Sequence, residues 1–149
     1  MRAIQGIAHL VYGFVGIALL VLAGPARAEP ILQFTKLACD SSVCSDFIEV
    51  QFGEPVQYFF QVDNVGDVSF TSVLISDPDL GLDVEFGSLP TNQGFAFTSN
   101  LYYLDPGTHS NIALAIGETE ADGSFVYVDT AVVDVLAPQI PQPHPSLSS

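Results

Sequence analysis

Regular alternation of apolar and polar residues is the feature that most constrains how this chain folds. The pattern is clearest in residues 56–63, where every second residue from Val56 to Val62 is apolar. Successive side chains of a β-strand point to opposite faces, so a period of two indicates a strand with one buried face. The segment therefore predicts a half-buried β-strand and argues against a helix.

Similar segments recur along the chain, separated by stretches rich in Gly, Pro, Asn and Asp. We predict further strands at residues 31–37, 47–52, 68–76, 82–86, 95–104, 112–116 and 125–136. No helical period occurs after residue 28. Seven or eight short strands with regular turn signals predict an all-β chain, an immunoglobulin-like antiparallel β-sandwich. A small barrel is the competing closure.

The larger apolar side chains of these strands are expected to face the core. The inward sets are Ile48, Val50 and Phe52; Phe95, Phe97, Leu101 and Tyr103; and Ile112, Leu114 and Ile116. Each set follows the period of two that a half-buried strand requires.

Residues 64–67 predict a hairpin turn, with Gly66 free to adopt a positive φ, that pairs strand 56–63 with strand 68–76. In the second strand the apolar positions change face near Ser72, which a β-bulge would produce. Residues 77–81 contain Pro78 and are expected to form a loop outside the ladder.

The first 28 residues have the order of a secretory signal peptide. Arg2 precedes an apolar run at residues 10–22, and Ala26-Arg27-Ala28 resembles a cleavage motif. The run is shorter than the roughly 20 residues that a membrane-spanning helix needs. We predict export to the periplasm, cell surface or medium with cleavage after Ala28. An uncleaved anchor is the alternative, and would attach the chain to a membrane.

The chain is strongly acidic, with a formal net charge of −14. Removal of residues 1–28 takes away Arg2 and Arg27 and leaves Lys36 as the only base other than histidine. Such a domain repels nucleic acid and anionic lipid, because phosphate binding needs clustered Lys and Arg. Solubility explains the acidity, and cation binding or a basic partner is the functional alternative.

Composition changes after residue 137, where proline recurs among Gln, His and Ser. Residues 138–149 therefore predict a disordered or polyproline-like tail. The expected organisation is a signal peptide at 1–28, one domain at 29–137 and this tail.

Cys39 and Cys44 are the only cysteines of the chain. An even pair in an exported protein predicts one disulfide. Two thiols without a third Cys or a nearby His do not complete a zinc site.

A set of motifs resembles a known family. The first group of positions is Val62, Asn64, Gly66, Asp67, Phe70, Val73, Ile75, Asp77 and Pro78. The second is Leu104-Asp105-Pro106-Gly107, Asn111-Ile112-Ala113 and residues 129–133. In order and spacing they resemble the immunoglobulin-like domains of unknown function that occur as tandem repeats in bacterial surface proteins. The resemblance implies a role in surface structure, adhesion or protein contact, and it carries over no catalytic residue. This chain departs from the pattern of that family in two ways: it has a single copy of the domain, and it carries the cysteine loop between Cys39 and Cys44.

Catalytic patterns are absent from the sequence. His109 is the only histidine between the leader and the tail, and no nucleophile elbow or phosphate-binding loop occurs. The acidic residues lie mostly at outward strand and turn positions, so we expect no enzyme.

Calcium is the ligand that the acidic loops suggest most directly. Asp77 and Asp79 share one loop, and Asp63 and Asp67 flank the expected hairpin. Calcium takes several carboxylate and carbonyl oxygens from such loops, although the spacing differs from the EF-hand pattern. A strand-ending turn explains Asp77 equally well.

Three function hypotheses follow. The first is a non-enzymatic exported component that contacts an unknown protein or surface polymer. The second is a calcium- or carbohydrate-binding module, with Phe47, Phe59 and Tyr102 as candidate exposed aromatics. The third is a subunit that shares a strand edge with its partner.

Overall fold

The structure is a computed structural model that describes residues 27–141. The predictions for residues 1–26 and 142–149 lie outside the described residues. The strands are β1 (Leu32–Cys39), β2 (Cys44–Ser45), β3 (Phe47–Gln51), β4 (Pro55–Asn64), β5 (Ser72–Asp77), β6 (Leu82–Phe86), β7 (Gly94–Thr98), β8 (Tyr102–Tyr103), β9 (Gly107–Thr119) and β10 (Gly123–Leu136). A single 3₁₀ turn, η1 (Pro78–Leu80), follows β5 within this part of the chain.

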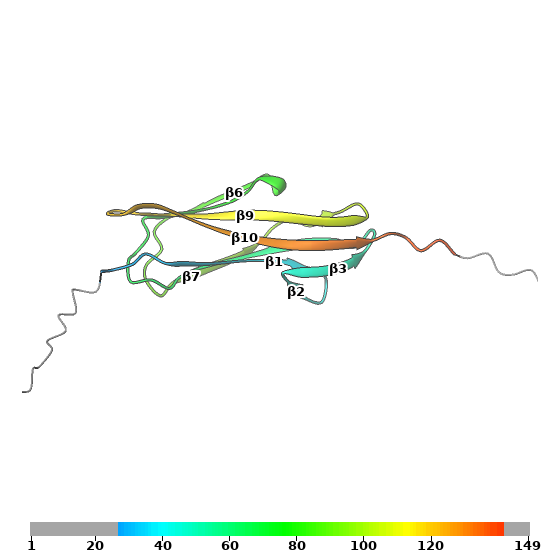
Figure 1. The fold of residues 1–149 in the computed structure, drawn as a ribbon, viewed down its shortest axis with the longest axis horizontal. Helices are drawn as coiled ribbons and strands as arrows, with labels where there is room; N and C mark the ends of the chain where they lie inside the picture. The colour runs from blue at the N-terminus through cyan, green and yellow to red at the C-terminus, as the bar shows by residue number, and fades with distance from the viewer. Residues whose placement is uncertain (1–26, 142–149) are drawn as a thin grey trace, which may run out of the picture.

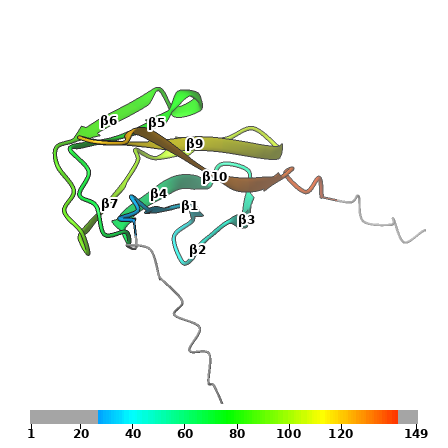
Figure 2. The ribbon, with the colours of Figure 1, turned by 60° about the vertical axis from the view of Figure 1, so that its left-hand side comes forward.

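The strands form two sheets that pack as two layers (Figures 1 and 2). The first sheet has the order β2-β1-β4-β7, with β8 also paired to β4, and the second has the order β3-β10-β9-β5-β6. All pairs are antiparallel except β3 with β10. The predicted immunoglobulin-like sandwich is confirmed. The described chain enters and leaves at opposite ends of the long axis (Figure 1).

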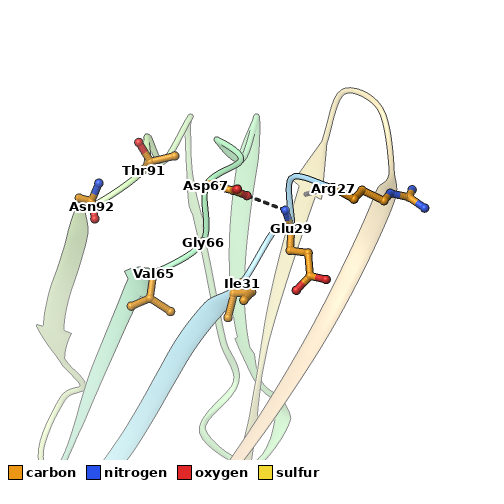
Figure 3. A pocket seen from close by; sticks show the side chains of 8 residues that line it. All are labelled: Arg27, Glu29, Ile31, Val65, Gly66, Asp67, Thr91 and Asn92. Atoms are coloured by element: carbon orange, nitrogen blue, oxygen red, sulfur yellow. Dashed lines mark hydrogen bonds between the residues drawn. The ribbon is translucent and has the colours of Figure 1, made fainter. Parts of the chain in front are cut away.

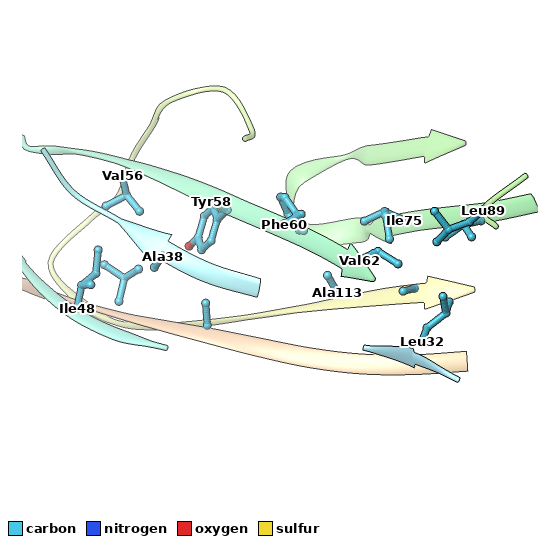
Figure 4. Close-up of a cluster of buried hydrophobic side chains, with 14 of the residues drawn as sticks. Leu32, Ala38, Ile48, Val56, Tyr58, Phe60, Val62, Ile75, Leu89 and Ala113 are labelled. Carbon is cyan, nitrogen blue, oxygen red and sulfur yellow. The ribbon is translucent and has the colours of Figure 1, made fainter. Parts of the chain in front are cut away.

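Strand β4 supplies the centre of the core, as its alternation predicted. Val56, Tyr58, Phe60 and Val62 are each at most 1% exposed. Their side chains point from the first sheet toward the second, where small residues such as Ala113 receive them (Figure 4). The large side chains of β4 therefore fill the space between the sheets.

The predicted inward face of β9 is wrong. The side chains that point inward are those of Asn111, Ala113, Ala115 and Gly117, whereas Ile112 is 50% exposed. Small residues are required on this face because bulky side chains from other strands occupy the space above it. The large apolar residues of β9 therefore point outward.

The predicted hairpin between β4 and β5 is also wrong. The two strands belong to different sheets, so residues 65–71 cross from one layer to the other. Gly66 does not have a positive φ. A Cβ atom there would instead collide with the carbonyl oxygen of Glu29 and lie 2.5 Å from the amide nitrogen of Ile31. The glycine is needed for close approach of two backbone segments and not for a turn.

Two predicted strands are shorter in the structure. The segment 95–104 breaks after Thr98, and Leu101 and Tyr103 are 55% and 69% exposed. The ladder is interrupted but not ended there, because Ser99 still bonds β4 through its backbone and pairing with β4 resumes at Tyr102 with the register shifted by one residue. Strand β3 ends at Gln51, so Phe52 lies in a turn and is 49% exposed.

The expected β-bulge near Ser72 is not needed to explain the change of face. Strand β5 begins at Ser72 and keeps an unbroken register with β9 through Ser76. Phe70 lies before the strand and forms an isolated bridge with Leu89. The shift therefore occurs where the crossing segment joins the sheet.

Candidate functional site

Lys36 occupies an inward position of β1 and is fully buried between the two sheets. It is the only lysine of the chain. Its Nζ lies 2.6 Å from Oδ2 of Asp77, whose side chain is also 0% exposed. The pair joins β1 of the first sheet to β5 of the second. A buried ion pair of this kind is rare in a core and marks the centre of a polar cluster.

Asp77 ends β5 and uses both of its carboxylate oxygens. Oδ1 accepts hydrogen bonds from Nδ2 of Asn111 at 3.1 Å and from the backbone N–H of Leu80 at 3.2 Å. The second bond caps η1, which begins at Pro78. Lys36, Asp77 and Asn111 are hereafter called the inter-sheet cluster.

Aromatic rings surround the amine of this cluster. Nζ of Lys36 lies 5.0 Å from the ring centroid of Tyr58 and 5.5 Å from that of Phe60. Burial lowers the pKa of Lys36, although hydrogen bonding and attraction to Asp77 oppose the shift. Burial, with the charge of Asp77, raises the pKa of Tyr58 to about 12. The surroundings therefore disfavour charge on both groups.

Asn111 brings an unsatisfied atom to the cluster. Its Oδ1 is buried, and among the described residues it is the one buried side-chain polar atom without a hydrogen-bond partner. Buried polar atoms are nearly always paired, so an exception requires an explanation.

A surface cavity of about 440 Å³ adjoins this cluster. Its lining residues are Tyr58, Asp79, Leu80, Tyr102, Leu104, Thr108, His109, Ser110 and Asn111. His109 is held by a 2.7 Å contact between Nε2 and the carbonyl oxygen of Asp105. Asn111 forms part of the wall of this cavity and so joins it to the inter-sheet cluster.

The four aspartates predicted to bind calcium do not form one group. Asp77 is buried against Lys36, and Asp79 lies two residues further along, in η1. Oδ2 of Asp63 accepts from Nε2 of Gln61 at 2.7 Å. Within residues 27–141 no group of three His, Cys, Asp or Glu side chains is placed to hold a metal ion.

Asp67 belongs to a second cavity, of about 500 Å³ (Figure 3). Its Oδ1 accepts from the backbone N–H of Glu29, which ties the crossing segment to the start of the domain. Asn64 is buried nearby and donates through Nδ2 to the carbonyls of Val68 and Leu89. The Asn64-x-Gly66-Asp67 motif therefore holds the crossing segment 65–71 against the start of the domain.

The remaining motif residues have structural positions. Cys39 and Cys44 form the predicted disulfide, with an S–S distance of 1.98 Å. Pro106 precedes Gly107, which begins β9 with a φ of 127°. Ala113 is buried on the inward face of β9.

The outer face of the second sheet carries an apolar stripe. On β9 and β10, cross-strand pairs join Ile116 to Val126 and Leu114 to Val128. The full stripe consists of Leu74, Ile112, Leu114, Ile116, Val126, Val128 and Val132. Val126 and Val128 are 58% and 60% exposed. We call this surface the outer stripe.

Acidic side chains border the outer stripe. They are Asp83 and Glu85 on β6, Glu118 on β9, Asp134 on β10 and Glu49 on β3. By contrast, the outer positions 57–63 of β4 on the other sheet are Gln57, Phe59, Gln61 and Asp63, of which Phe59 alone is apolar. The outer face of this central strand is therefore more polar than the outer stripe.

Sequence reasoning missed the inter-sheet cluster. Its signal was present: alternation places Lys36 in register with Leu32 and Phe34, and Asp77 in register with Val73 and Ile75. A lysine and an aspartate at inward positions of two strands suggest a buried pair. Asn111 could not be found this way because β9 was assigned the opposite face.

Known proteins resemble this chain only weakly. The chain matches no known protein family and no curated protein. One similar solved structure is the CARDB domain of the PF1109 protein from Pyrococcus furiosus, in complex with di-metal ions, at 18% identity and a TM-score of 0.49 over 73% of this chain and 96% of that one. Another is Northeast Structural Genomics Consortium target SoR45, at 14% identity and a TM-score of 0.34 over 79% and 95%. Identities this low assign neither family nor ligand.

Within residues 27–141 there is no helix of the length and apolar character needed to cross a membrane.

Proposed function

We propose that this chain is an exported, non-enzymatic domain that binds a protein partner through the outer stripe. The observation that carries the proposal is the exposure of a continuous apolar surface at the centre of the five-stranded sheet. Ile112, Val126 and Val128 are each at least 50% exposed. Large apolar patches with a polar border are typical of protein contact sites.

Charge argues for a partner different from this chain. Within residues 27–141, Lys36 is buried and Arg27 is the one Lys or Arg side chain at the surface, where it pairs with Asp122. Two copies facing each other would bring acidic borders together without compensating bases. A partner with an apolar centre and a basic border would complement the surface.

Export is supported by the leader-like residues 1–28 and by the Cys39–Cys44 disulfide. Disulfides persist in oxidising compartments and are rare in the cytosol. The outer stripe is apolar and exposed, which is why we propose binding and not catalysis.

Site-specific photo-crosslinking in the cells of origin tests this proposal. A photoreactive amino acid replaces Ile112 in one variant and Thr98, on the outer face of the other sheet, in the control. We expect one discrete adduct with a basic protein from position 112, which weakens at high salt, and none from position 98. Three results would each overturn the proposal: an adduct at twice the mass of the chain, equal labelling from both positions, or no adduct.

The double variant Ile112→Ser/Val128→Ser supplies a second measurement. Both side chains point outward, so the fold should persist while the adduct from a probe at Leu114 is lost. Unchanged labelling would show that the outer stripe is not the contact surface.

A further inference from the structure

The inter-sheet cluster is a costly arrangement for a core. A buried ion pair contributes little net stability, because desolvation of both charges offsets their attraction, and apolar residues of similar size often serve better. The single lysine of this chain, Lys36, lies at a position with no solvent contact. An amine in the middle of an apolar core suggests a chemical role for that group.

The geometry brings a nucleophile and a carboxamide to one carboxylate. Asp77 binds Nζ of Lys36 through Oδ2 and Nδ2 of Asn111 through Oδ1. The two partners come from different sheets, with Lys36 on β1 and Asn111 on β9. A carboxylate between an amine and an amide can take a proton from the first and give it to the second.

The two ends of the Asn111 carboxamide lie in different surroundings. Oδ1 is buried without a protein hydrogen-bond partner. Nδ2, the atom that would leave, is the one that contacts Asp77.

We propose that Lys36 and Asn111 form an intramolecular isopeptide bond, with Asp77 as the proton carrier. Asp77 accepts a proton from the Lys36 ammonium, and the free amine attacks Cγ of Asn111 to form the new C–N bond. Asp77 delivers that proton to Nδ2 as the old C–N bond breaks and ammonia leaves.

The attacking nitrogen then releases its second proton through Asp77 to the departing ammonia. An ammonium group and a carboxamide thus become a secondary amide and an ammonium ion. Atoms and charge balance, no oxidant is required and the carboxylate is regenerated.

The surroundings suit this step. The burial that lowers the pKa of Lys36 increases the fraction of free amine, which is the nucleophilic form. The fold also holds both groups on one carboxylate, so the reaction needs no encounter between separate molecules. The product would covalently join the two sheets between β1 and β9.

The intact mass of the purified, reduced full chain tests the inference directly. Relative to the mass calculated from its observed N-terminus, we expect a deficit of about 17 Da, the mass of ammonia. Trypsin should not cut after Lys36 in the denatured protein. Cleavage after glutamate should release residues 30–49 joined to residues 86–118. A full calculated mass, or a deficit of about 18 Da from condensation with the Asp77 carboxyl, would overturn the inference.

Variants identify the groups involved. Asn111→Ala and Lys36→Arg should have full mass, whereas the control Asn100→Ala, at an exposed position, should keep the deficit. Asp77→Asn tests the proton carrier and should also have full mass, with circular dichroism used to establish that it folds. A deficit that survives in folded Asn111→Ala would place the bond elsewhere and refute the assignment.

Discussion

Gly117 on β9 provides the sharpest test of how the core is packed. A Cβ atom at this position would lie 2.6 Å from a ring carbon of Phe70 and 2.8 Å from a methyl of Leu32. Phe70 is 0% exposed and its ring also meets Phe125 edge-on, with centroids 6.4 Å apart. The ring cannot move aside freely, so Gly117→Ala should lower the free energy of unfolding by about 1–3 kcal/mol.

Phe70→Ala should be more damaging alone, by about 3–5 kcal/mol, because it leaves a cavity where the ring was. The double variant should lose less than the sum of the two single variants. Removal of the ring makes room for the new methyl group, so a favourable coupling of about 0.5–3 kcal/mol is expected.

Urea unfolding of the four proteins, followed by far-ultraviolet circular dichroism, measures this cycle. Gly87→Ala is the matched control, since Gly87 is exposed and a Cβ atom there meets nothing within 4 Å. It should change the stability by less than about 1 kcal/mol. Additive losses for Gly117→Ala and Phe70→Ala would refute the claim that the ring is what excludes a side chain from position 117.

Three further outcomes follow from the structure. Because the pKa of Tyr58 is raised to about 12, the unfolded phenol ionises first. The free energy of unfolding should therefore fall as pH rises from about 10 to 12. In an absorbance titration of the phenol groups, the step with the highest pKa should be missing in Tyr58→Phe. Gly66→Ala should destabilise the domain by about 1–3 kcal/mol and speed amide exchange at residues 29–31, since the new Cβ would collide with their backbone. If Lys36 is bonded to Asn111, mechanical unfolding by the two ends of the chain should extend it by roughly 250 Å less than Asn111→Ala. The bond would keep about 75 residues from extending, at about 3.3–3.6 Å each.

Local patterning predicted where several strands lie, but it did not always predict which face of a strand is buried. The alternation of β4 correctly predicted four buried side chains, and the bounds of β6 match the predicted strand. The prediction for β9 failed because both faces of that strand carry plausible residues. Its inward face is small and its outward face is large, the reverse of what hydrophobicity alone suggests.

In the candidate site, too, the local role of a residue could be predicted from sequence and its long-range contact could not. A turn explained Asp77 from sequence, and its capping of η1 bears out that interpretation. Its bond to Lys36 spans two sheets and 41 positions of sequence, so no local motif describes it.

The sequence by itself determined that this chain is an all-β domain with turns at Gly and Pro, and it identified the disulfide pair. These properties depend on neighbours along the chain, whose side chains alternate and whose turns are chemically marked. Only the tertiary structure decided that β4 and β5 lie in different sheets, that small residues of β9 face inward, and that Lys36, Asp77 and Asn111 meet. The reason is physical: which face of a strand is buried depends on the volume offered by the opposing sheet, and that volume is set by residues distant in sequence.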